Sequence, residues 1–260
     1  MNGIELDRDE LAALVQLLSA NRVFGVADVL PAEPAAREAA FVTGLEKLRA
    51  RGYVKGQTPG QVVPDTGLLR LVSVLVDPRV VIVAERAGSV DAALHYADDD
   101  GFVSLEGDGA SGYRIGWVET TDLLARRVLR FLEIDPDTRS GSVAVRLPEA
   151  AFSSAREVAR SADLAAIEEA LVAGGVARPK AAEVAPTMQA GGHVLAIRLN
   201  RGQAEAARRA WVLASRPALS GWVGWRESVE DADLRLEPLS AERLADVLSR
   251  FVEYLSPARA

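Results

Sequence analysis

Three stretches in the first 76 residues carry apolar residues every three or four positions, which is the spacing of one buried helix face. Asp7 suits the N-cap of the first stretch, Pro34 the first turn of the second, and Gly52 the position just past its end. The pattern predicts a short strand at 4–6 followed by helices over 9–19, 35–51 and 68–76. On the second helix, the residues expected to face inward are Phe41, Val42, Leu45 and Leu48.

The pattern changes to strand character after Pro78. Runs rich in Val, Ile and aromatic residues predict strands, and the turn-forming segments between them predict hairpins. A helix capped by Thr120 and running through Ile134 is predicted to follow the strands. The expected strands cover 79–85, 92–97, 102–106 and 113–118, with turns at 98–101 and 107–112.

The second half of the chain repeats this order of elements after a polar segment, DPDTRSGS, at 135–142. Apolar positions correspond at a constant offset, as Leu124 and Leu132 do with Leu244 and Val252. The predicted elements are a strand at 143–147, a helix opened by Pro148, a helix capped by Asp163, strands at 193–199, 211–215, 221–227 and 233–237, and a last helix capped by Ser240.

These correspondences favour an internal duplication, with chance similarity of two α+β segments as the alternative. The hypothesis is an α+β fold with two half-domains, 1–134 and 143–260, joined by the linker 135–142 and forming one compact domain. A quasi-two-fold axis would relate the halves. A central, mostly antiparallel sheet would be flanked by helical bundles, because an antiparallel sheet needs one covered face.

Composition and charge exclude several classes of protein. The chain has 260 residues, no Cys, two His and a formal charge of −7. Without Cys it has no disulfide, no thiolate metal site and no Cys nucleophile. The acidic charge argues against nucleic acid as a partner. No apolar run approaches the roughly 18 residues of a membrane span, and a signal-peptide pattern is absent, so we expect a cytoplasmic protein that does not bind membranes.

Four features invite a chemical interpretation. GDGASG at 107–112 matches a dinucleotide motif, but a strand is expected after it instead of the required helix. The acidic turn at 98–101 lacks the first-position acid and the final Glu of a calcium loop. His95 and His193 have no ligand or triad partner nearby in the sequence. We therefore expect no cofactor, no metal and no enzymatic activity. The alternative is an enzyme or small-ligand sensor with a site between the halves, around either histidine.

Two features favour binding of a partner protein. Trp211, Trp222 and Trp225 gather in the predicted C-terminal strands. Trp222 and Trp225 lie three positions apart in one of these strands, so they should point to opposite faces, and an uncovered ring would be an exposed anchor. The alternative is that both rings belong to the core. The second feature is a pair of polar, Gly-containing loops at 86–91 and 200–207, each after the first long strand of its half. Loops on a rigid sheet often carry recognition.

The order of elements resembles a known family. The segments that carry the resemblance are AREAAFVTGLEKLRARGYV, VPDTGLLRLVSVLVDPRVVIVAE, SGSVAVRLPEAAF and ADLRLEPLSAERLADVLSRFV. In this order they resemble the EspG family, the cytosolic chaperones of actinobacterial type VII (ESX) secretion. The resemblance spans nearly the whole chain. The chain departs from the family at 21–34 and at 200–209, which leaves the substrate open.

The resemblance implies a quasi-two-fold fold and a non-enzymatic role, keeping a helical secretion substrate soluble. The implied partner is a PE/PPE-like or WXG-like helical protein, and the chain itself would be a monomer or a homodimer. By position, the family's partner contacts match the loop 86–91 and the last helix. With the two tryptophans added, the candidate partner-binding residues are Arg86, Ser89, Asp91, Trp222, Trp225 and Phe251.

Overall fold

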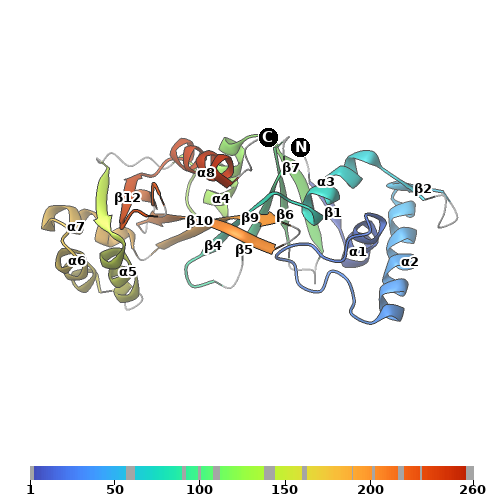
Figure 1. Ribbon diagram of the computed structural model, residues 1–260, viewed down its shortest axis with the longest axis horizontal. Helices are drawn as coiled ribbons and strands as arrows, with labels where there is room; N and C mark the ends of the chain where they lie inside the picture. Colours follow the sequence, from blue (N-terminus) through green and yellow to red (C-terminus); the bar gives the residue numbers. More distant parts are fainter. Residues whose placement is uncertain are drawn as a thin grey trace. The chain divides into compact units, whose positions relative to one another are not determined.

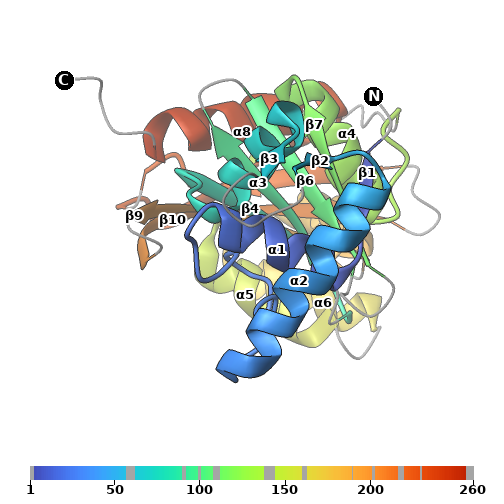
Figure 2. The ribbon, with the colours of Figure 1, turned by 90° about the vertical axis from the view of Figure 1, so that its right-hand side faces the viewer.

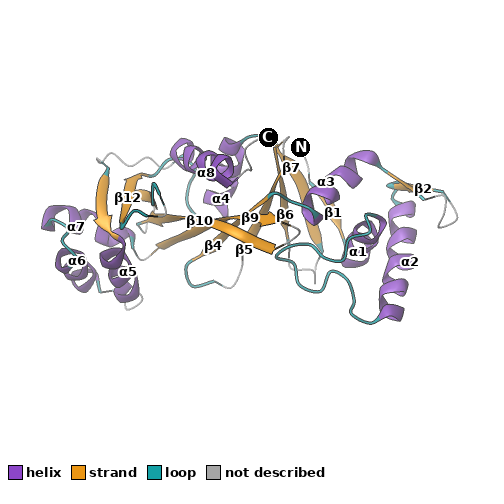
Figure 3. Ribbon diagram, viewed as in Figure 1, coloured by secondary structure: helices purple, strands orange, loops and turns teal. Residues whose placement is uncertain are grey.

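The computed structural model describes residues 3–56, 62–89, 92–98, 101–107, 112–137, 144–159, 163–188, 190–200, 203–215, 220–228 and 230–255. Within these ranges the chain forms eight α-helices, a large, mostly antiparallel sheet of ten strands and a small sheet of two (Figure 3). The predicted α+β class and its antiparallel sheet are confirmed.

The first half contains β1 (Ile4–Leu6), α1 (Arg8–Leu17), α2 (Pro34–Ala50), β2 (Val54–Lys55), β3 (Val63–Pro64), α3 (Thr66–Val76), β4 (Val80–Arg86), β5 (Ala92–Asp98), β6 (Gly101–Glu106), β7 (Tyr113–Val118) and α4 (Thr121–Phe131). The second half contains β8 (Val145–Pro148), α5 (Glu149–Val158), α6 (Leu164–Ala173), α7 (Arg178–Val184), the 3-10 turn η3 (Ala185–Thr187), β9 (Ala190–Asn200), β10 (Gln203–Ala214), β11 (Gly221–Trp225), β12 (Asp233–Pro238) and α8 (Ala241–Leu255).

The strand order is the same in both halves when each is read from its outer edge. The ten strands follow the order β1-β7-β6-β5-β4-β9-β10-β11-β12-β8. When only the strands of the large sheet are counted, each half places its first strand at the edge, followed inward by its fifth, fourth, third and second. Shared connectivity of this kind supports the duplication hypothesis, which stays a prediction.

The chain divides into two compact units that are interleaved along the sequence. The first comprises Met1–Ile82, Leu94–Glu119 and Ile197–Ala206, and the second comprises Val83–Ala93, Thr120–Ala196 and Ala207–Ala260. The half-domain boundaries at 134 and 143 stay a prediction. The expected linker at 135–142 lies outside the described residues from 138 onward.

In the first unit, α1 begins at a capping box. Asp7 accepts a hydrogen bond from the backbone N of Glu10 (2.9 Å), and the Glu10 carboxylate accepts one from the backbone N of Asp7 (2.8 Å). Gly52 follows α2 with φ +78°, a conformation that suits glycine. Both end signals are as predicted. Figure 2 shows α2 lying against α1. At the contact α2 carries Gly44, and the lack of a side chain there lets the two helices approach closely.

The prediction that Val42 faces inward is wrong, because its side chain is 49% exposed. The buried positions of α2 are Gly44, Leu45 and Leu48. Val42 precedes Gly44 by two positions, which is about 200° around a helix axis. Val42 therefore points away from α1, although its spacing from the other apolar residues of α2 is that of residues on one helix face.

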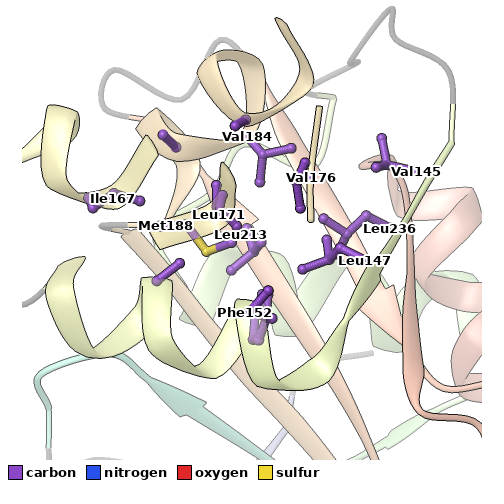
Figure 4. Close-up of a cluster of buried hydrophobic side chains, with 14 of the residues drawn as sticks. Val145, Leu147, Phe152, Ile167, Leu171, Val176, Val184, Met188, Leu213 and Leu236 are labelled. Carbon is purple, nitrogen blue, oxygen red and sulfur yellow. The ribbon is translucent and has the colours of Figure 1, made fainter. Parts of the chain in front are cut away.

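In the second unit, three helices cover one end of the sheet. Figure 4 shows Phe152 of α5, Leu171 of α6 and Val184 of α7 converging on Leu213 and other strand residues. The sequence analysis predicted no element between 176 and 192, yet α7 and η3 supply several members of this core. The buried cluster comprises Val145, Leu147, Ala151, Phe152, Ala155, Ala159, Ile167, Leu171, Val176, Ala181, Val184, Ala185, Met188, Leu213, Trp222, Leu234 and Leu236.

The helices α4 and α8, also in the second unit, lie side by side (Figure 1). Thr120 caps α4 by accepting from the backbone N of Leu123 (3.2 Å), and Ser240 caps α8 by accepting from that of Arg243 (3.0 Å). A hydrogen bond of 3.0 Å joins the hydroxyls of Ser249 and Thr121 across the pair. Both predicted caps are confirmed.

The prediction of a loop at 200–207 is wrong. β9 continues through Asn200 and β10 begins at Gln203, so the two strands form a long hairpin. The segment QAEAARRA at 203–210 has low intrinsic strand propensity, which hid the strand in the sequence. Hydrogen bonding along a neighbouring strand outweighs that propensity, because strand formation depends strongly on tertiary context.

Candidate partner-binding surface

A shallow cavity of about 200 Å³ opens on the second unit. It combines partly exposed apolar side chains with several arginines. We call it the Trp211 groove and define it by its lining residues, which are Glu149, Leu195, Ala207, Arg208, Arg209, Trp211, Arg226 and Leu234. They come from α5, β9, β10, β12 and the residue after β11.

Strand alternation aims the side chains of β10 in two directions. Arg209 and Trp211 are two positions apart and share a face, whereas Arg208 belongs to the other face. The Trp211 ring packs against Phe152 of α5 and His193 of β9, each with a centroid separation of 5.2 Å. Arg208 lies over the exposed ring of Tyr254 on α8, 3.9 Å from its centroid.

Positive charge gathers around Trp211. The guanidinium groups of Arg156 and Arg209 lie 5.4 and 5.5 Å from the ring centroid, within the range of a cation–π interaction. Arg226 pairs with Glu149 at 3.3 Å. Glu149, the one carboxylate in the lining, pairs with Arg226, and Arg208 belongs to the other face of β10. Arg209 therefore gives the groove a net positive charge on a chain whose net charge is −7.

His193 lies beside this ring and is held in the neutral form. Its Nε2 is 3.2 Å from a carboxylate oxygen of Glu85. Burial lowers the pKa of His193 below its ordinary value, and the charges of Arg209 and Arg156 lower it further, although Glu85 opposes them. His95 lies in the first unit, where it is buried and its Nδ1 shares a 2.8 Å hydrogen bond with Ser104 Oγ. The two histidines thus occupy packed strand positions.

The loop that begins at Arg86 is shaped by backbone contacts. Ala87 N donates to Gly191 O (2.9 Å), Ser89 N donates to Arg86 O (3.2 Å), and Gly88 has φ +78°. The Arg86 guanidinium pairs with Glu133 beyond the end of α4. Arg86 and Ser89 are therefore partly accessible residues of a defined turn, while Asp91 lies outside the described part of the chain.

The three aromatic candidates are all buried. Trp222 is 1%, Trp225 3% and Phe251 5% exposed, and β11 is buried along its whole length. Of the two alternatives for the tryptophans, burial favours the core. Any role of these three residues in partner binding stays a prediction. The sequence pattern points to Trp211 as one of three neighbouring tryptophans, but it does not pair Trp211 with Arg209, because the predicted strand begins at Trp211 and leaves Arg209 out.

A larger cavity of about 720 Å³ lies in the first unit, and its charged side chains are paired. Lys47 lies 2.8 Å from Asp7, and Arg51 lies 2.7 Å from Glu10. Burial acts to raise the pKa of Asp7, but hydrogen bonds from Lys47 and from the backbone of Glu10 lower it overall. A carboxylate stabilised in its charged form is a poor general acid at neutral pH, so this cavity fits a structural ion-pair cluster.

The sequence motifs that suggested ligands lie between paired antiparallel strands. Asp98 pairs with Gly101 at the end of β5 and β6, and the segment 107–112 joins β6 to β7, a strand. Residues 99–100 and 108–111 are outside the described ranges. Among the residues that the structure describes, no group of three or more His, Asp or Glu side chains could hold a metal ion. In the same ranges, no helix has the length and apolar character needed to cross a membrane.

Comparison with solved structures identifies a shared fold. The chain is similar to the Mycobacterium tuberculosis type VII secretion system chaperone EspG5, whose structure was solved in complex with a PE25–PPE41 dimer. The TM-score is 0.64 at 15% sequence identity, and the match covers 99% of this chain and 98% of that chain. No protein-family model matches the sequence, and no curated protein matches it.

Proposed function

We propose that this chain is a non-enzymatic, cytoplasmic binding protein that acts as a type VII secretion chaperone. The observation that carries the proposal is a fold shared with EspG5 over essentially the full length of both chains. The match extends over nearly the whole of both chains, and not only over one common motif. The paired charges of the larger cavity support a role without catalysis.

The proposed partner is a helical secretion substrate, PE/PPE-like or WXG-like, with an apolar tip that aggregates when exposed. An exposed apolar patch of that kind is stabilised when a complementary surface covers it. EspG5 binds a PE25–PPE41 dimer in its structure, which supports this class of partner. On this chain the proposed contacts are the loop 86–91 and α8. Phe251 would support that surface as a buried residue of α8, whereas Trp222 packs in the cluster beneath α5, α6 and α7.

Co-expression tests the proposal. The chain is produced with helical PE/PPE-like or WXG-like proteins encoded next to its gene, and complexes are sized by light scattering after gel filtration. We expect a soluble complex that contains the chain and the helical partner, and we expect the partner to precipitate when produced alone. A partner that stays soluble alone, or that never co-elutes with the chain, would contradict the proposal.

Charge reversal at the loop tests the contact surface. Arg86→Glu should weaken partner binding at least tenfold, and Arg130→Glu on the exposed side of α4 serves as the control. Arg86→Glu also breaks the pair with Glu133, so the swap Arg86→Glu/Glu133→Arg restores that pair with reversed charges. If the double variant recovers full binding, Arg86 only shapes the loop and does not contact the partner.

A further inference from the structure

The Trp211 groove contains an exposed arginine, Arg209, for which the described part of the chain offers no carboxylate partner. Arg209 lies 5.5 Å from the Trp211 ring centroid, and no carboxylate within the described ranges of the chain pairs with it. Many other arginines of the same unit are neutralised: Arg86 by Glu133, Arg146 by Glu227, Arg178 by Glu168 and Glu169, Arg226 by Glu149, and Arg235 and Arg243 by Glu237. The positive charge of Arg209 therefore remains available to a partner.

The size of the groove fits one or two side chains of another protein. Its volume of about 200 Å³ is below the roughly 300–1,000 Å³ of typical small-molecule sites. Leu195 and Ala207 extend the apolar surface beside Trp211, and each is at least partly exposed. An apolar side chain could pack on this floor while a neighbouring carboxylate reaches Arg209 at the rim.

The chemistry of the rim selects for carboxylates. A guanidinium presents paired N–H donors that match a carboxylate, and one stacked on an aromatic ring is already oriented. Arg209 is held in this way over Trp211, and Arg226 is positioned by Glu149 at 3.3 Å. On a helix, an apolar residue and acidic residues three or four positions away lie on adjoining faces, so a single helical turn could present both groups.

We infer that the Trp211 groove binds an acidic helical segment of the partner, with an apolar side chain on Trp211 and a flanking carboxylate on Arg209. This inference rests on the proposed function and adds the charge of the segment that is recognised. Charge complementarity carries it, because the groove is cationic although the whole chain is acidic.

The test uses two fluorescent 20-residue helical peptides with the same leucine face, one with Glu and one with Lys at the flanking positions. Anisotropy with the full chain measures their Kd. The Glu peptide should bind at least tenfold more tightly than the Lys peptide, and added salt should reduce the difference. Arg209→Gln should weaken binding of the Glu peptide about five- to tenfold. Arg178→Gln, an exposed arginine on α7, should leave it unchanged.

Equal affinity for both peptides, or no effect of Arg209→Gln, would overturn the inference. Arg209 is exposed, so its substitution should not prevent folding, and circular dichroism of the variant checks this. The same variant separates the two proposals. If the chain captures its helical partner with unchanged affinity after Arg209→Gln, the groove inference fails and the chaperone proposal stands. If the Glu peptide binds but no helical partner is captured, the chaperone proposal fails alone.

Discussion

Glu237 is a buried carboxylate that connects β12 to the first turn of α8. Its side chain is 4% exposed and pairs with Arg235 (2.5 Å) and Arg243, which are each about one third exposed. Removing one partner of a buried ion pair leaves the other charges poorly compensated, which costs about 3–5 kcal/mol when all are buried. Because water reaches both arginines, we expect Glu237→Gln to lower the free energy of unfolding by about 2–3 kcal/mol.

Urea unfolding measures this change, and Glu227→Gln is the matched control. Glu227 also pairs with Arg235, but its side chain is 39% exposed. Exposed pairs contribute about 0–1 kcal/mol, so the control should shift the unfolding midpoint little. Equal shifts for the two variants would show that burial of Glu237 does not determine the strength of the contact.

His193 should make stability depend on pH. Its pKa is lower in the folded chain than its ordinary value of 6.5, so the unfolded chain takes up the proton first as pH falls. The contribution is fully present above pH 6.5 and is lost as pH falls toward the folded-state pKa. Glu85, Arg156 and Arg209 face this ring from β4, α5 and β10, and the two arginines oppose its protonation.

Unfolding free energies of the wild type and His193→Gln, measured from pH 8 to pH 5, check this expectation. The stability advantage of the wild type should shrink as pH falls below 6.5, since glutamine does not titrate. A difference between the two proteins that stays constant over this range would contradict the assigned direction of the pKa shift.

Local signals at single residues were readable from the sequence, but the groove was not. Asp7, Thr120 and Asp163 were predicted as helix caps, and each accepts hydrogen bonds from the first turn of its helix. These contacts join residues two or three positions apart. The environment of Trp211 depends on Phe152 and His193, which are far from it in sequence. No local sequence pattern indicates that these three side chains come into contact.

At the scale of elements, the packing of α1 on α2 depends on Gly44. A Cβ added there would lie 2.1 Å from the backbone O of Asp9 and 2.8 Å from the Cβ of Ala13. Helix propensity alone would make Gly44→Ala stabilising by about 1 kcal/mol. We expect the opposite sign, with a loss of at least about 2 kcal/mol, because backbone atoms of α1 must move away.

Thermal unfolding tests this sign. Thr43→Ala places a new alanine at the exposed neighbouring position of α2, where it should change the Tm by no more than a degree or two. Gly44→Ala should lower the Tm by several degrees. An increase in Tm for Gly44→Ala would mean that propensity outweighs the contact and that α1 can shift at little cost.

Elements with strong periodic patterns were predicted well, and those that rely on their neighbours were not. The helix α3, predicted at 68–76, runs from Thr66 to Val76, and the strand predicted at 113–118 is β7. β10 was shortened in the prediction because Ala, Arg and Gln at 203–210 favour helix over strand. α7 has seven residues, too few for a periodic signal to stand out.

At the scale of the whole molecule, α4 from the first half of the sequence packs with elements of the second half. Within the second compact unit, Thr121 of α4 hydrogen-bonds Ser249 of α8 (3.0 Å), and Ala87 N donates to Gly191 O (2.9 Å). Leu132 also lies against Gly192. The sequence predicted two halves joined at 135–142, but contacts such as these decide whether a half is stable by itself.

Producing the two halves as separate fragments tests whether each half needs the other to fold. Fragments 1–137 and 144–260 each lack part of the second unit, so each should be aggregated or unfolded when produced alone. Without α4, the fragment 144–260 lacks the helix that packs beside α8 and the hydrogen bond between Thr121 and Ser249. Produced together, the fragments should co-purify as a 1:1 complex with the circular dichroism spectrum of the intact chain.

The matched control introduces a charge into α8. Leu248 is fully buried on this helix, so Leu248→Asp in fragment 144–260 should abolish association, because it would bury an unpaired carboxylate in the helix that packs beside α4. Glu253→Asp, at an exposed position of the same helix, should leave association intact. Two fragments that are monodisperse and folded alone, and that do not associate, would make each half an independent domain. They would also contradict the hypothesis that both halves form one compact domain.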